Sequence, residues 1–226
     1  MLHDAPVLLL DLDNTLIDRD AAFRRYLADF LARHAAAFAG QSRQDKNDRQ
    51  AVMQEIIALD AHGRTPRAQF CSALLQRYPA LPFTPDSLWH DHQRILDHFE
   101  YNAAIPAMLL RLATRYRLGL ISNGSGPMQR RKLRDAGIES LFALVLISGE
   151  AGVAKPQAEI FQRALSFFHA DSATMVGDDP HNDIRPAHAL GLATIHIALP
   201  GDTPEALADH VLTDILHLEE TLSCST

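Results

Sequence analysis

Cysteine is scarce in this sequence, and long apolar runs are absent from it. The two cysteines, Cys71 and Cys224, lie far apart and match no zinc-ligand spacing, which argues against a disulfide framework or a cysteine-rich metal site. No run approaches the ~20 consecutive apolar residues of a membrane span. The first four residues, Met-Leu-His-Asp, lack the basic start of a signal peptide. We therefore expect a cytoplasmic protein that does not associate with membranes.

The chain also has less positive than negative charge. It contains 21 Lys and Arg against 28 Asp and Glu, a formal net charge of −7. Nucleic-acid affinity rests largely on clustered Lys and Arg, so the composition argues against a nucleic-acid partner. A small anionic ligand remains possible, because it responds to the charges of its own site. A chain of 226 residues, 47% of them hydrophobic, can form one large domain or a domain with an insertion.

Short apolar runs alternate with helical patterns after residue 100, and a similar run lies near the N-terminus. Such alternation predicts right-handed βαβ crossovers and a parallel sheet with helices on both faces. The fold class expected is therefore α/β, with a Rossmann-like core. The predicted strands are Val7–Leu10, Arg117–Asn123, Ala143–Ile147, Ala173–Gly177 and Ala193–Ile197.

Residues 18–99 show helical patterns and no strand signal. Five apolar residues between Phe23 and Leu31 recur at the spacing of an amphipathic helix. Thr65-Pro66 and Thr84-Pro85 each predict a helix start, with the threonine as N-cap and proline at the first helical position. Further helices are expected at Asp48–Ala61, Pro66–Tyr78 and Pro85–Phe99. The segment is too long for an ordinary connection, so we expect an inserted helical subdomain at 18–99 and a core of 1–17 with 100–226.

Polar residues follow four of the predicted strands, where the carboxyl ends of a parallel sheet face one crevice. Three or four carboxylates, a hydroxyl and an ammonium group would meet there. Such a set suits Mg²⁺ together with a phosphate group. The residues are Asp11 and Asp13 after the first strand, Ser122 and Asn123 after the second, Lys155 after the third, and Asp178 and Asp183 after the fourth.

Each of these signals also has an ordinary structural explanation. Asp-x-Asp-Asn and Ser122 are common in turns, an isolated lysine is usually a solvated surface residue, and Asp178-Asp179-Pro180 is a typical helix cap. These explanations do not account for all four signals occurring at strand ends in one chain. Three histidines fit no metal-ligand spacing, so we interpret them as surface or core residues: His181, His188 and His196.

The motifs together resemble those of the haloacid-dehalogenase-superfamily phosphatases, from about Val7 to Ala198. The stretch Gln129–Phe161 is similar to the branch with a helical cap after the first motif, which includes pyrimidine 5′-nucleotidases and N-acylneuraminate-9-phosphatases. The matching motifs are Asp11-Leu12-Asp13-Asn14-Thr15, Ile121-Ser122-Asn123-Gly124, Lys155-Pro156, and Val176-Gly177-Asp178 with Asn182-Asp183.

The resemblance implies a role for each site residue. Asp11 would be the nucleophile, and Asp13 the general acid and base. Ser122, the N–H of Asn123 and Lys155 would hold the phosphate, with Lys155 also offsetting the charge of the nucleophile. Mg²⁺ would bind the side chains of Asp11 and Asp178 and the backbone carbonyl of Asp13, and Asp183 would support these ligands without contacting the ion.

The resemblance also implies an Mg²⁺-dependent phosphatase acting on a small phosphomonoester, with a nucleoside monophosphate as first candidate. A sugar-phosphate phosphatase or a phosphomutase would use the same core, and a non-enzymatic phospho-acceptor domain has a similar set of residues. Asp13 argues against a dehalogenase, which needs no acid for an alkoxide leaving group. The inserted segment would select the substrate, with Arg43, Lys46, Arg49, Arg64 and Arg67 as candidates to meet a second anionic group. The sequence leaves the oligomeric state open.

Overall fold

The chain divides into two compact units. A computed structural model describes residues 5–38 and 46–224, with the side chains of 46–48 and 224 left out. One unit, the core unit, comprises residues 1–18 and 101–226, and the other, the helical unit, comprises residues 19–100. The sequence-based boundaries had been placed one residue earlier, at 17/18 and 99/100.

The core unit is built on a six-stranded parallel sheet with strand order β3-β2-β1-β4-β5-β6. The parallel α/β fold and the five predicted strands are confirmed, each strand to within one residue at either end. The sixth strand was missed, because three residues are too short to show an alternating pattern. The strands are β1 (Val7–Leu10), β2 (Arg117–Ser122), β3 (Leu144–Ile147), β4 (Thr174–Gly177), β5 (Ala193–Ile197) and β6 (His210–Leu212).

Strand β1 lies at the point where the strand order reverses. It pairs with β2 on one side and β4 on the other, and its Leu8, Leu9 and Leu10 are completely buried. The ladder continues one residue beyond β1, where the N–H of Asp11 donates to the carbonyl of Val176 at 2.9 Å. In open parallel sheets the crevice at such a reversal is where ligands bind, so this pairing sets the position of the site.

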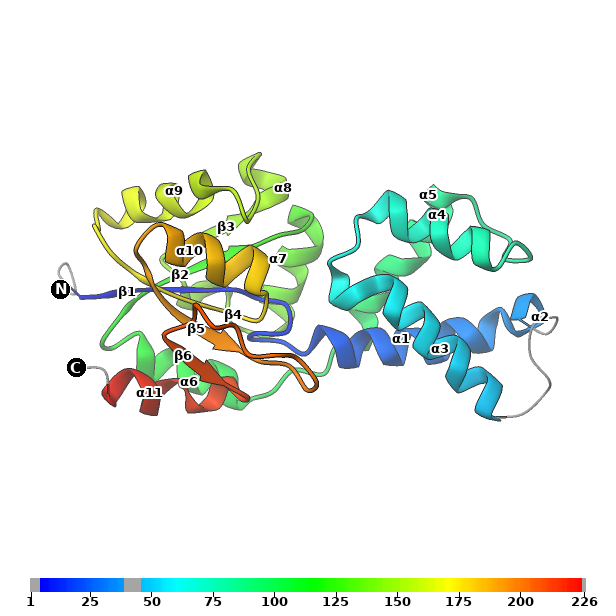
Figure 1. Ribbon diagram of the computed structural model, residues 1–226, viewed down its shortest axis with the longest axis horizontal. Helices are drawn as coiled ribbons and strands as arrows, with labels where there is room; N and C mark the ends of the chain where they lie inside the picture. Colours follow the sequence, from blue (N-terminus) through cyan, green and yellow to red (C-terminus); the bar gives the residue numbers. More distant parts are fainter. Residues whose placement is uncertain (1–4, 39–45, 225–226) are drawn as a thin grey trace. The chain divides into compact units, whose positions relative to one another are not determined.

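Helices cover both faces of the sheet, with α9 and α10 on one side and α6 and α11 on the other (Figure 1). Helix α9 buries Ile160, Phe161, Ala164 and Phe168 in a core cluster that includes Leu9 of β1. The helices are α6 (Ala104–Leu112), α7 (Gly126–Asp135), α8 (Ser148–Ala151), α9 (Ala158–Phe168), α10 (Arg185–Ala189) and α11 (Leu218–Cys224).

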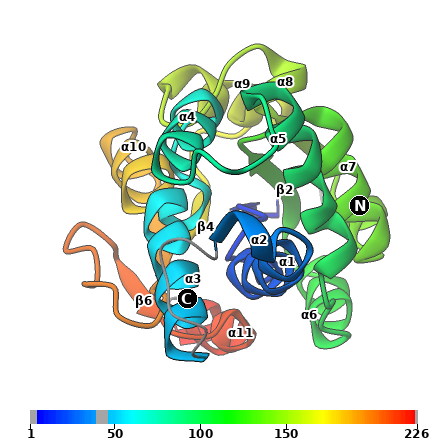
Figure 2. The ribbon, with the colours of Figure 1, turned by 90° about the vertical axis from the view of Figure 1, so that its right-hand side faces the viewer.

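The helical unit contains no strand among its described residues. Helices α4 and α5 lie side by side in Figures 1 and 2, and α1 buries the apolar stripe that the sequence predicts, from Phe23 to Leu31. The helices are α1 (Arg19–Arg33), α2 (Ala35–Phe38), α3 (Lys46–Asp60), α4 (Arg67–Arg77) and α5 (Pro85–His92), with 3₁₀ turns η1 (Ala61–Gly63) and η2 (Gln93–His98).

Two expectations for this unit differ from the structure. Thr84 caps α5 as predicted, in a capping box with Ser87, but Thr65 does not cap α4. The Thr65 hydroxyl donates instead to the carbonyl of Leu59 at 2.7 Å, and α4 begins at Arg67. The predicted helix Pro85–Phe99 is α5 followed by the 3₁₀ turn η2, a local tightening that apolar spacing does not reveal.

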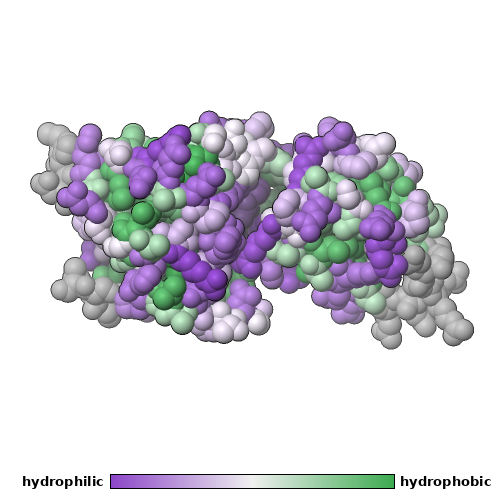
Figure 3. Space-filling view, turned by 45° about the horizontal axis from the view of Figure 1, so that its top comes forward, coloured by the Kyte–Doolittle hydropathy of each residue, from purple (hydrophilic) through white to green (hydrophobic). Residues whose placement is uncertain are grey.

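Few large apolar residues are strongly exposed on the part of the surface that the structure describes. Those most exposed are Leu110, Phe167, Leu207 and Val211, and Figure 3 shows a mostly polar face with small apolar areas between the polar groups. No helix among the described residues is long and apolar enough to cross a membrane.

Candidate active site

The chain turns sharply after β1 and carries Asp11 and Asp13 on that turn. The N–H groups of Leu16 and Ile17 both donate to the carbonyl of Leu12, at 2.9 and 3.1 Å, which folds the segment back on itself. Asn14 has a φ of 59°, a left-handed conformation that asparagine tolerates better than most residues. The tight turn fixes both carboxylates at the carboxyl end of the central strand.

The segment after β4 holds the second group of carboxylates. Asp179 caps the π-helical turn η4 (Pro180–Ile184), accepting from the N–H of His181 at 2.8 Å and of Asn182 at 3.3 Å. Helix capping is thus the role of Asp179 rather than Asp178. The turn brings Asp183 back toward the end of β4, where its Oδ2 accepts from the N–H of Asp179 at 3.1 Å.

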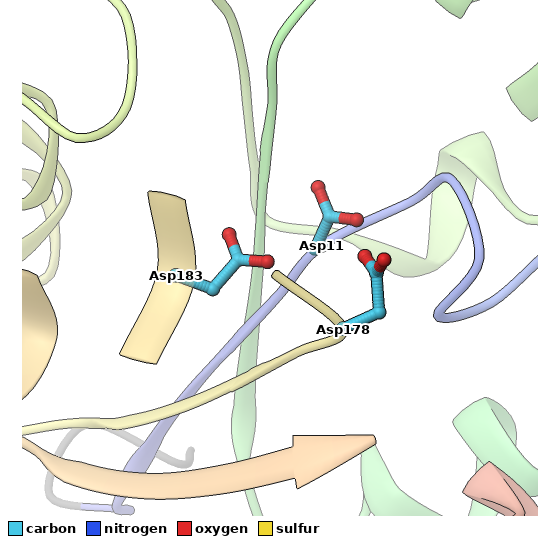
Figure 4. Close-up of side chains that lie close together, drawn as sticks. All are labelled: Asp11, Asp178 and Asp183. Carbon is cyan, nitrogen blue, oxygen red and sulfur yellow. The ribbon is translucent and has the colours of Figure 1, made fainter. Parts of the chain in front are cut away.

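Three buried carboxylates converge at the strand ends, those of Asp11, Asp178 and Asp183. One carboxylate oxygen from each lies within 4.8 Å of the others. Figure 4 shows the three side chains close together, Asp11 from the turn after β1 and the other two from the segment after β4. Like charges this close need a compensating positive charge or a shared proton.

Lys155 supplies part of that compensation. Its Nζ lies 2.5 Å from Oδ1 of Asp11 and 2.5 Å from Oδ1 of Asp183, and the residue is 5% exposed. Burial disfavours the charged ammonium, but the two carboxylates outweigh that effect and raise the pKa of Lys155 above its ordinary value. Lys155 is therefore a charged residue of the site and not the surface lysine of the alternative explanation.

Burial also changes the acidity of the carboxylates. It raises the pKa of Asp11 well above the ordinary range of aspartate, partly offset by Lys155 and reinforced by the nearby Asp183. The pKa of Asp183 is raised for the same first reason, burial, with Lys155 again opposing the shift. A further cation at this point would favour the ionised form of both groups.

The donor set fits a small divalent cation. When all are ionised, the three carboxylates and the Lys155 ammonium carry a net negative charge, and their oxygens are hard ligands of the type that Mg²⁺ prefers. The oxygens of Asp183 accept from Lys155 and from the N–H of Asp179, which suits a supporting role better than direct ligation. Asp11 and Asp178 are then the candidate ligands.

Ser122 and Asn123 lie at the end of β2, next to β1. The Asn123 side chain bonds both backbone groups of Lys155, donating to its carbonyl at 2.8 Å and accepting from its N–H at 3.0 Å. This pair of bonds ties the loop that carries Lys155 to the end of β2. Ser122 is buried, and its hydroxyl oxygen accepts from Nε2 of Gln129 at 2.6 Å.

Two polar residues of α7 contact Asp13, and the sequence interpretation had given neither a role. Lys132 Nζ lies 2.7 and 2.8 Å from the two carboxylate oxygens of Asp13. Gln129 Nε2 donates to Oδ2 of Asp13 at 2.9 Å. One sequence signal could have revealed them, because Gln129, Lys132 and Leu133 recur at i, i+3 and i+4 and therefore share a face with a buried leucine.

The histidines take no part in this cluster. His181 and His188 are exposed, and the buried His196 is a core residue with Nε2 3.2 Å from the carbonyl of Asp178 and Nδ1 accepting from the N–H of Glu205. The proposed anion-binding residues of the helical unit include Arg49, Arg64 and Arg67, which are exposed. Arg43 and the side chain of Lys46 lie outside the described residues.

Comparison with known proteins identifies the family. Residues 6–191 match the model of the haloacid dehalogenase-like hydrolases. The chain is 31% identical to glyceraldehyde 3-phosphate phosphatase of Pyrococcus abyssi over 201 residues, which cover 84% of this chain and 79% of that protein. The chain therefore belongs to the haloacid dehalogenase-like hydrolase family, and the resemblance drawn from its motifs is confirmed.

Other relatives match over shorter stretches. The chain is 40% identical to phosphoserine phosphatase of Thermus thermophilus over 43% of its length and 41% of that protein. It is 36% identical to the pyrimidine 5′-nucleotidase YjjG of Escherichia coli over 48% of its length and 50% of that enzyme. These two matches span about half of each chain or less.

Solved structures of the family share the fold. The magnesium-bound HAD-hydrolase YfnB of Bacillus subtilis superposes with a TM-score of 0.73 over 96% of this chain and 98% of that one, at 21% identity. At this identity the match establishes the fold alone.

A substitution of Gly177 tests how tightly the carboxylate cluster is packed. A Cβ at this position would lie 2.3 Å from Oδ2 and 2.6 Å from Cβ of Asp183, which is buried and cannot move without leaving Lys155. We expect Gly177→Ala to lower the free energy of unfolding by about 1–3 kcal/mol, measured by urea denaturation. Gly191→Ala is the comparison for backbone strain without crowding, because Gly191 has a φ of +74° and nothing lies within 4 Å of the added Cβ. A Gly177→Ala protein as stable as the wild type would contradict this packing.

Proposed function

We propose that this protein is an Mg²⁺-dependent phosphatase that hydrolyses a small phosphomonoester through an aspartyl phosphate on Asp11. One observation carries the proposal: the convergence of Asp11, Asp178 and Asp183 with their ligand atoms within 4.8 Å, two of them contacting Lys155. Carboxylates, an ammonium group and a hydroxyl gathered at one sheet edge are suited to a phosphate group and its counter-ion.

Positive charge next to Asp11 favours its ionised form and compensates the charge of the phosphate. The Lys155 ammonium favours the carboxylate form of Asp11 and offsets its repulsion with an incoming phosphate. Asp11, Asp178 and the backbone carbonyl of Asp13 would hold Mg²⁺, which would supply the further positive charge that a phosphate dianion needs. Asp183 also contacts Lys155, and in the proposed mechanism it supports the lysine without contacting substrate.

The reaction divides into two displacements at phosphorus. An oxygen of Asp11 attacks phosphorus, the bond to the leaving oxygen breaks, and Asp13 gives that oxygen a proton. Water then attacks the aspartyl phosphate and gives a proton to Asp13, so that phosphate leaves and both carboxyl groups return to their starting states. Ser122 and the N–H of Asn123 bind phosphate oxygens in both steps.

The substrate class follows from the family and not from the site. The named relatives include phosphatases of phosphoserine and glyceraldehyde 3-phosphate and a pyrimidine nucleotidase, and a phosphomonoester is what these names have in common. We infer a small, soluble phosphomonoester, with a nucleoside monophosphate as one candidate among several. The relatives' names cover amino-acid, sugar and nucleotide phosphates and favour none of these three classes.

Metal removal tests the proposed ion. We expect p-nitrophenyl phosphate hydrolysis near neutral pH to be lost in EDTA and restored by excess Mg²⁺, because the carboxylate cluster needs a cation to accept a phosphate dianion. Released p-nitrophenolate measures the rate, and circular dichroism before and after chelation controls for unfolding. Full activity in a preparation shown to be metal-free would contradict the proposed ion site.

Substitution of the two aspartates on the β1 turn tests their separate roles. Asp11→Asn should lower kcat by at least about 10⁴-fold while the protein stays folded, because it removes the nucleophile at nearly constant volume. Asp13→Asn should lower kcat by about 10²–10⁴-fold on glycerol phosphate and by less on p-nitrophenyl phosphate, whose leaving group needs little protonation.

These variants test the proton transfer by Asp13 and the covalent step on Asp11 separately. Equal losses for Asp13→Asn on both substrates would remove the acid role from Asp13. An Asp11→Asn protein with wild-type turnover would remove the covalent step altogether.

A further inference from the structure

Helix α7 places a glutamine and a lysine on its buried side. Gln129 and Lys132 are three residues apart, so they share one face of the helix, and they are 2% and 5% exposed. The neighbouring Arg131 and Arg134 are exposed on the same helix. A fully buried lysine is rare unless it is paired, so its partner indicates its role.

The partner of Lys132 is Asp13. Nζ of Lys132 contacts both carboxylate oxygens, at 2.7 and 2.8 Å, so the ammonium holds the carboxylate symmetrically. The two aspartates on the β1 turn therefore each have a lysine, Lys155 for Asp11 and Lys132 for Asp13. A buried ion pair is a poor source of stability, because desolvation offsets most of its attraction. A contribution to stability therefore does not explain why Lys132 is paired with Asp13.

Gln129 links Asp13 to Ser122. Its Nε2 lies 2.9 Å from Oδ2 of Asp13 and 2.6 Å from Oγ of Ser122. In the arrangement seen here Asp13 accepts from the NH₂ group of Gln129, as it must when it is ionised, and the second N–H of that group is available to Ser122. A serine oxygen that accepts from Gln129 keeps its own proton for another acceptor. In the proposed function that acceptor is an oxygen of the phosphate.

Gly124 makes room for this glutamine. A Cβ at position 124 would lie 3.0 Å from Cδ and 3.1 Å from Cγ of Gln129, and the residue has a φ of +143°. The glycine after Ser122 and Asn123 thus allows the Gln129 side chain to pass close to the backbone and reach the end of β2.

We propose that Lys132 and Gln129 are positioning residues for the acid and base Asp13, and that Gln129 also orients the Ser122 hydroxyl toward the phosphate. This inference rests on the proposed function. Lys132 and Gln129 act through Asp13 and do not themselves give or take the proton that is transferred. Lys132 fixes the side chain of Asp13 where, as a carboxylic acid, it gives a proton to the leaving oxygen and then, as a carboxylate, takes one from water. Gln129 couples that position to the phosphate-binding residue next to it.

A double-mutant cycle tests the Lys132 part. Lys132→Met should lower kcat on glycerol phosphate by about 10- to 100-fold, because a general acid contributes about 10²–10⁴-fold and the substitution should remove part of this. The KM should stay within about twofold of wild type. In an Asp13→Asn background the same substitution should change kcat by less than about threefold, because the group that Lys132 positions no longer functions. Arg134→Met, on the exposed side of α7, is the matched control and should leave kcat and KM unchanged.

A second cycle tests Gln129. Gln129→Met removes both donors at similar volume, so it should lower kcat as Lys132→Met does and also raise KM, through Ser122. The rise in KM should disappear in a Ser122→Ala background, while the effect on kcat remains. A KM increase that persists without Ser122 would contradict the proposed orientation of the hydroxyl.

Folding is measured separately by urea denaturation of every variant. If Lys132→Met is too unstable to assay, Lys132→Gln, which keeps a donor without the charge, replaces it in the same cycle. Equal losses from the Lys132 substitution with and without Asp13 would overturn the inference, since a structural lysine gives additive effects. Wild-type turnover of Asp11→Asn would instead overturn the proposed function, so the two failures are distinguishable.

Discussion

The buried ammonium of Lys155 is the interaction on which the rest of the site depends. It contacts Asp11 and Asp183 at 2.5 Å each and lies where a parallel sheet brings three carboxylates together. Without this charge the cluster would protonate or separate, because like charges at low dielectric repel strongly. The Asn123 side chain fixes the Lys155 backbone, and Asp179 fixes the turn that returns Asp183. These hydrogen bonds to backbone groups position the charged side chains.

The same arrangement explains why two aspartates only two residues apart can act differently. Asp11 lies among buried carboxylates beside Lys155, where a cation is needed, whereas Asp13 is held by Lys132 and Gln129. One environment suits a nucleophile next to an ion, and the other suits a group that gives and takes a proton. A difference in surroundings, with identical side-chain chemistry, separates the two proposed roles.

Most of the fold and the main site residues could be predicted from sequence, because apolar runs and strand-end polar residues follow from a parallel sheet. Asp11 and Lys155 are far apart in the chain, yet the carboxyl-edge rule was enough to bring them together. Lys132 was not found, since a lysine on a polar helix looks like a solvated residue until its burial is known. Thr65 was misassigned because a threonine before proline fits a helix cap, and only tertiary structure shows its hydroxyl bonded to Leu59. Substrate identity has no comparable local signal.

Chemical trapping of the covalent intermediate tests the central claim most directly. The protein would be mixed with Mg²⁺ and a phosphomonoester that it hydrolyses, quenched during turnover with sodium borohydride, digested, and analysed by mass spectrometry. Borohydride reduces an aspartyl phosphate to homoserine, and we predict homoserine at position 11 and at no other aspartate. Turnover without modification of Asp11, or reduction at Asp13, Asp178 or Asp183 instead, would contradict the assignment of Asp11 as the nucleophile.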